Sequence, residues 1–256
     1  MKSFLPWHFA VFFIYICGHG QIVKNIEHEP AVWGGYISSI KISEHVSVWN
    51  DLHYVPESFF IYRTGLSWHF TPQVVGTVGY AYLNTTPISN GLLARSEHRP
   101  WGQLVFNFKI GEAAQFNHRI RYDYRIRQSV AGGEIVDGDW MAYHRLRFMS
   151  SLRFPLIGKN LGDYKPFFSV NNEILFNFGK NIIWNYFDQN RSWLNFGYQV
   201  PGATFQIGYM LRWVQGSVPG NAIYYHTALF WITHVIDARK VRSPVKPENE
   251  LLHREP

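Results

Sequence analysis

The chain has 256 residues, of which 46% are apolar and 18% aromatic, whereas only 16% are charged. Globular domains carry roughly 25% charged residues and disordered chains carry more charge with few aromatics, so this composition excludes a disordered protein. The formal net charge is +6, but the arginines recur at every second position rather than in a run. This spacing places them on one face of a strand and argues against a nucleic-acid-binding arm.

Residues 1–20 are predicted to be a signal peptide. Lys2 precedes a short apolar run, and small residues stand at −3 and −1 before Gln21. The run is too short to cross a bilayer as a helix, which needs about 20 apolar residues. Cys17, the only cysteine, could instead anchor a lipoprotein, but Ile16 stands where a small residue is expected. Cleavage before Gln21 would leave a mature chain without disulfide or thiol chemistry.

The clearest strand pattern follows in residues 115–127. Even positions are aromatic, aliphatic or His, and odd positions are Gln, Asn, Asp or Arg, without a break over thirteen residues. This period of two predicts a strand. The same period recurs, with interruptions, in residues 60–70, 140–154, 168–178, 194–200 and 205–213. Strands in soluble proteins have about 5–6 residues, whereas a tilted strand that crosses a bilayer needs about 9–11.

The connections between these strands alternate in length. Residues 71–73, 111–113 and 201–202 are predicted tight turns, whereas 84–95, 128–139 and 179–188 are long, polar predicted loops. Short periplasmic turns and longer outer loops are typical of an outer-membrane barrel, in which closure satisfies every backbone group in lipid. Tryptophans near strand ends resemble the aromatic girdles at the two membrane interfaces: Trp68, Trp101, Trp140, Trp193 and Trp213.

The expected strand number combines a count along the chain with the parity of bacterial barrels. About eleven strands can be read between Val32 and Ile236, but bacterial barrels have an even number. We therefore predict a transmembrane, up-and-down antiparallel β-barrel of about twelve strands, with ten as the alternative. The domain plan is a signal peptide (1–20), an N-terminal segment (21–31), the barrel (32–237) and a flexible C-terminal tail (238–256).

If the apolar faces meet lipid, the charged faces point into the barrel, because a charge on the lipid face would cost about 2–4 kcal/mol at the midplane. The expected charge network of the lumen comprises Arg63, Glu97, Arg99, Arg119, Arg121, Asp123, Arg125, Arg145, Arg147, Glu173, Arg191 and Arg212. Two interpretations of this network stay open. It is either a salt-bridged plug in a narrow barrel or a cationic lining that favours anionic solutes.

The sequence offers no recognisable catalytic or metal-binding motif. Seven barrel histidines are candidates for a lipid hydrolase, and His118 and His144 fall on the lipid-facing side, but none stands beside a serine in a known motif. The only local grouping of metal-ligand types is residues 27–29, which a solvated segment explains better. We therefore expect no enzyme activity, no metal and no cofactor.

Several blocks resemble one known family. They are residues 96–104, 117–122, 145–147, 151–156, 187–191, 197–198 and 207–210. Their order and spacing are similar to the bacterial outer-membrane barrels classed as domain of unknown function 2490. The resemblance covers the chain from about Val32 onward and implies a barrel without an assigned activity, so no catalytic residue is carried over. The tail after the last strand departs from that pattern.

Together these features predict a porin-like protein of a Gram-negative outer membrane, with a structural role or a narrow passive pore that prefers anions. Its expected partners are outer-membrane lipid and small anionic solutes, and no nucleic acid. Two alternatives remain. One is a membrane-embedded hydrolase of lipid or lipid A. The other is a soluble periplasmic β-sandwich or lipocalin-like binding protein, in which the apolar face would point inward and the arginines outward.

Overall fold

The computed structural model describes residues 25–85, 94–111, 113–158, 161–183, 185–216 and 219–241. The predicted signal peptide with Cys17, most of the expected loop 84–95, and the tail beyond residue 241 lie outside these residues. The described part is eleven strands and one short helix: β1 Asn25–Lys41, β2 Val46–Val55, β3 Phe59–His69, β4 Val74–Thr85, β5 Arg95–Ile110, β6 Ala114–Ala131, β7 Glu134–Pro155, β8 Lys165–Phe178, β9 Phe187–Val200, β10 Ala203–Gln215, β11 Asn221–Asp237 and α2 Ala238–Val241.

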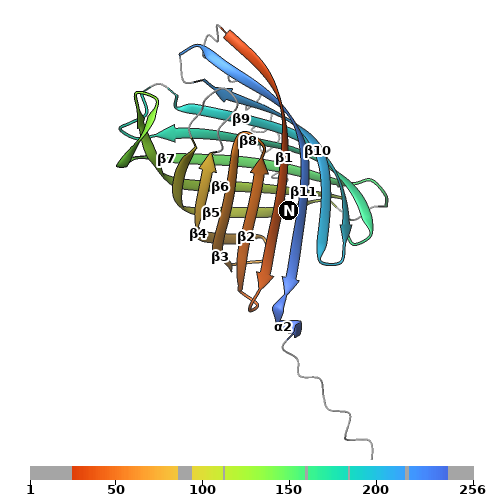
Figure 1. Ribbon diagram of the computed structural model, residues 1–256. Helices are drawn as coiled ribbons and strands as arrows, with labels where there is room; N and C mark the ends of the chain where they lie inside the picture. Colours follow the sequence, from red (N-terminus) through yellow and green to blue (C-terminus); the bar gives the residue numbers. More distant parts are fainter. Residues whose placement is uncertain are drawn as a thin grey trace, which may run out of the picture.

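The strands form one closed barrel in which each strand pairs with its neighbours in the chain. Consecutive strands are antiparallel, but β1 and β11 pair in parallel, from Asn25 opposite Asn221 to Lys41 opposite Asp237. Figure 1 shows β1 and β11 side by side, with their arrowheads pointing the same way. An odd number of consecutive strands makes the first and last run in the same direction, so the closing pair must be parallel.

This architecture corrects the expected strand number and pairing. The described residues form eleven strands rather than twelve or ten, and the barrel is mixed rather than wholly antiparallel. The count of eleven read along the chain was right, and the requirement for an even number was wrong here. β1 also starts at Asn25, before the expected boundary at Val32.

The connections alternate between the two ends of the barrel. β3 and β4, β5 and β6, and β9 and β10 meet at one end, here called the short-turn rim, where turns are predicted. β4 and β5, β6 and β7, and β8 and β9 meet at the other end, here called the loop rim, where long loops are predicted. The predicted loop at 128–139 is wrong. Residues 128–139 are not a loop, because β6 continues to Ala131 and β7 begins at Glu134, and a tight Gly132-Gly133 turn joins them.

The two faces of the barrel wall differ sharply in chemistry. Large apolar side chains are exposed on the outside, for example Val78 at 68%, Ile207 at 59% and Phe196 at 57%. Arginines are buried on the opposite face, where Arg121 is 1% exposed. This is the reverse of the sidedness expected of a soluble lipocalin-like barrel, whose apolar residues would point inward.

The tryptophans divide between these faces. Trp68 near the short-turn rim and Trp140 near the loop rim are exposed at 50% and 38%. In contrast, Trp101 and Trp193 are buried in two apolar clusters, and Trp213 packs against a phenylalanine of β9. The girdle assignment therefore does not hold for Trp101 and Trp193, because both share the strand face of the arginines, whereas Trp213 occupies an outward position of β10.

Candidate functional site

The twelve residues expected to form a charge network lie on β3 and on β5 to β10. Ten of them are buried, and Arg119 and Arg191 are half-buried. The structure joins most of them through a few shared carboxylates, and it adds partners that the pattern did not single out.

Glu97 in β5 is fully buried and has three arginine partners. Arg99 Nε lies 2.5 Å from its Oε1, and Arg127 Nε lies 3.0 Å from its Oε2. Arg125 donates through Nε to Oε1 and through Nη2 to Oε2, the latter at 2.8 Å. Three guanidinium groups thus share one carboxylate, so this group keeps a positive net charge.

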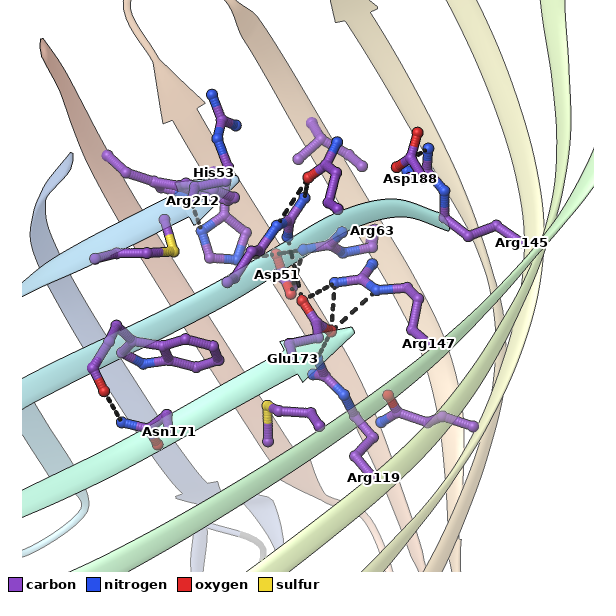
Figure 2. A pocket seen from close by; sticks show the side chains of 18 of the residues that line it. Asp51, His53, Arg63, Arg119, Arg145, Arg147, Asn171, Glu173, Asp188 and Arg212 are labelled. Carbon is purple, nitrogen blue, oxygen red and sulfur yellow. Dashed lines mark hydrogen bonds and ion pairs between the residues drawn. The ribbon is translucent and has the colours of Figure 1, made fainter. Parts of the chain in front are cut away.

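Glu173 in β8 forms a second group of the same kind, shown in Figure 2. Arg147 Nη2 lies 2.8 Å from its Oε1, Arg119 Nη2 lies 2.6 Å from the same oxygen, and Arg191 Nη1 lies 3.2 Å from Oε2. These arginines come from β7, β6 and β9, so Glu173 ties four strands together. Arg147 also lies 3.7 Å from Asp123.

Asp51 in β2 anchors a third group, which the sequence reading missed. Its carboxylate accepts 2.9 Å hydrogen bonds from Arg63 and lies 2.8 Å from His53 Nε2. The Trp33 indole N–H donates to His53 Nδ1 at 3.0 Å. Both ring nitrogens of His53 are therefore engaged, which leaves neither free to take a proton from a substrate.

Asp188 forms a fourth group with Arg145, at 2.8 Å. Asn177 bridges them, accepting from Arg145 Nε and donating to Asp188, both at 2.9 Å. Asp188 occupies an even position in β9, which period two places on the outer face. A register irregularity in the β8–β9 pairing, where Leu175 faces Gln189 and Phe176 faces Phe187, turns Asp188 inward instead.

Three further arginines contact aromatic rings and form no ion pair with a carboxylate in the described part of the chain. Arg121 Cζ lies 4.7 Å from the ring centroid of Trp101, and Gln103 accepts two hydrogen bonds from its guanidinium. Arg153 Cζ lies 4.2 Å from the ring of Phe167. Arg212 Cζ lies 4.2 Å from the ring of Tyr225. Stacking of this kind holds a guanidinium in place without cancelling its charge.

A cavity of about 740 Å³ remains between these groups. Its lining includes Asn107 and Gln115, next to the β5–β6 turn at the short-turn rim, and Thr85 and Arg127, toward the loop rim. Ten arginines line it: Arg63, Arg99, Arg119, Arg125, Arg127, Arg145, Arg147, Arg153, Arg191 and Arg212. The carboxylates on this lining are three: Asp51, Glu173 and Asp188. The cavity wall is therefore strongly cationic.

Outside this cavity, the histidines form other contacts. The outward-facing His118 and His144 lie as the sequence pattern indicated, and Tyr122 contacts His144 at 2.6 Å. His118 Nδ1 lies 3.0 Å from Ser150 Oγ, a pair that joins β6 to β7 and that no sequence motif revealed. Within the described residues, no cluster of His, Cys, Asp and Glu is suited to a metal ion.

The fold and the charged groups define a closed β-barrel with an arginine-lined cavity. Residues 31–222 match the family model described as protein of unknown function (DUF2490), so the chain belongs to this family. No curated protein and no solved structure is similar to the chain. In the described residues, no helix is long and apolar enough to cross a membrane.

Proposed function

We propose that the protein spans the bacterial outer membrane through its eleven strands. The support is the sidedness of the wall, with large apolar side chains exposed outside and arginines buried inside. In water this arrangement would expose far more apolar surface than soluble proteins tolerate, whereas in lipid it removes that surface from water. The short-turn rim would then face the periplasm and the loop rim the exterior, as in other such barrels.

We further propose that the interior passes small anions. The observation that carries this proposal is the imbalance on the cavity wall, where ten arginines stand against three carboxylates. A water-filled passage with low-dielectric walls concentrates the counter-ion of its lining charge, so anions would enter in preference to cations. The cavity of about 740 Å³ favours this passage over a complete salt-bridged plug.

Planar bilayers test the passage. Purified full-length protein should give small conductance steps, and its reversal potential in a KCl gradient should have the sign for chloride. Arg153→Gln, which removes a lining charge that has no ion-pair partner among the described residues, should reduce the anion preference. Arg239→Gln also removes one positive charge, but beyond the end of β11, and it should leave the anion preference unchanged.

Two outcomes would overturn the passage. Absence of any conductance would leave the ion pairs as a structural plug. A cation-selective reversal potential would show that the arginine surplus does not govern the permeating ions.

A second candidate function is hydrolysis of a lipid ester on the outward face of the barrel wall. It is favoured by one contact, the 3.0 Å approach of Ser150 Oγ to His118 Nδ1 on the side that would face lipid. A serine within hydrogen-bond reach of a base is the core of a nucleophilic hydrolase, although such sites also use a group that orients the base. Asn172 of β8 is the register partner of Ser150 of β7, so it lies beside this pair.

The hydrolase is tested with phospholipid vesicles and purified protein. Release of fatty acid that is lost in both Ser150→Ala and His118→Ala, and kept in the matched outward variant Ser192→Ala, would support it. Equal release from all four proteins, or none, would remove it.

A further inference from the structure

Two arginines stand directly opposite each other on the cavity wall. Arg212 of β10 and Arg191 of β9 are register partners, and both line the cavity. Directly opposed side chains on neighbouring strands lie about 5 Å apart at Cβ, and like charges there are destabilising. Both guanidinium groups also lie over the indole of Trp33, with Cζ at 5.7 Å from its centroid for Arg212 and 5.2 Å for Arg191.

The two arginines are unequally neutralised. Arg191 reaches Glu173 and donates twice to Gln189 Oε1, at 3.0 and 2.6 Å. Arg212 is 5% exposed, its buried Nε has no hydrogen-bond partner, and it forms no ion pair with a carboxylate in the described part of the chain. A buried guanidinium without a counter-ion is costly, so the pair offers a strong site for an anion.

One side of this pair is apolar. Arg212 lies over Tyr225, and a buried cluster adjoins it, made of Trp33, Val55, Trp193, Met210 and Leu229. The indole N–H groups of Trp193 and Trp231, both on the cavity lining, are buried and have no hydrogen-bond partner. A ligand that fits this end of the cavity combines a negative group with a compact apolar body.

We propose that Arg212 and Arg191 bind a small organic carboxylate whose apolar body packs on Trp33 and Tyr225. The planar guanidinium matches a carboxylate through two parallel N–H···O bonds, whereas inorganic phosphate has no part that would use the aromatic faces. This inference rests on the proposed function only because the ligand reaches the site through the same interior. The site itself requires no net flow across the membrane.

The experiment is isothermal titration of detergent-solubilised full-length protein with four probes: benzoate, cyclohexanecarboxylate, acetate and inorganic phosphate. The two carboxylates with a ring should bind at least tenfold more tightly than acetate and phosphate. Arg212→Gln should weaken benzoate binding at least tenfold. Arg212→Lys keeps the charge but lacks the planar guanidinium, so it should weaken benzoate binding by a smaller factor. Arg239→Gln, which removes one positive charge beyond the end of β11 and outside the cavity lining, should bind benzoate as the parent does.

Several results would overturn the site. They are equal benzoate affinity in the parent and in both Arg212 variants, phosphate or acetate binding as tightly as benzoate, or no binding at all. Far-UV circular dichroism of each variant confirms that the barrel is folded, and Arg212→Lys keeps the test decisive if Arg212→Gln does not fold. Benzoate binding without bilayer conductance would refute the passage and leave this site. Anion-selective conductance without benzoate binding would refute only this site.

Discussion

Replacing Glu97 by Gln removes one of the two carboxylates that are each shared by three arginines. Glu97 is fully buried, and Arg99, Arg125 and Arg127 all contact it. At an effective dielectric constant of about 20, each pair of unit charges about 4 Å apart attracts by about 4 kcal/mol before desolvation is subtracted. Breaking a buried ion pair from one side costs about 3–5 kcal/mol net. Because three guanidinium groups lose their counter-ion together, we expect the upper end, about 5 kcal/mol.

The assay is urea unfolding of the protein from phosphatidylcholine vesicles, followed by tryptophan fluorescence. The free energy of unfolding should fall by about 5 kcal/mol in Glu97→Gln. Asp139→Asn, a matched loss of one acid at an exposed position of β7, should change it by about 0.5 kcal/mol or less. A loss below about 1 kcal/mol in Glu97→Gln would refute the view that this carboxylate holds the arginine group together.

Two further predictions follow from the wall of the barrel. Gly79→Ala should lower the free energy of unfolding by roughly 1–3 kcal/mol, because the new Cβ would lie 2.1 Å from the Thr64 carbonyl oxygen. Gly102→Ala is the control. Its new Cβ would lie 3.7 Å from the nearest atom, so it should show no such loss. In vesicles with brominated acyl chains, Trp68→Phe should remove part of the quenchable tryptophan fluorescence, since Trp68 is exposed outside. Trp101→Phe should remove none of it, since Trp101 is buried. The opposite pattern would contradict the assigned faces.

The sequence predicted the strands best where the two faces differ most. In β6 the arginines alternate with aromatic and aliphatic residues, and the structure keeps that alternation throughout the charged part of the strand. The pattern was strong there because an error of one residue would move every arginine to the opposite face. The same reasoning placed all twelve charged residues on one side of the wall.

Other features could not be read from a period of two. Asp188 turns inward through an irregularity of the β8–β9 register, which leaves no mark in the alternation. Trp101 and Trp193 share the arginine face, but tryptophan is also typical of membrane interfaces, so composition alone could not separate the two places. The parallel closure of β1 on β11 depends on pairing between residues about two hundred positions apart, about which local sequence is silent.

Spin labels on β10 test most directly whether the apolar face of this barrel meets lipid. Single cysteines are placed, in a Cys17→Ser background, at the exposed Ile207 and Tyr209 and at the inward Gln206 and Met210, and the protein is reconstituted in bilayers. We predict high collision rates with oxygen, which dissolves in lipid, at Ile207 and Tyr209, and low rates at Gln206 and Met210. Equal oxygen collision rates at all four positions, or high accessibility of Ile207 and Tyr209 to a water-soluble nickel chelate, would contradict a membrane-spanning barrel.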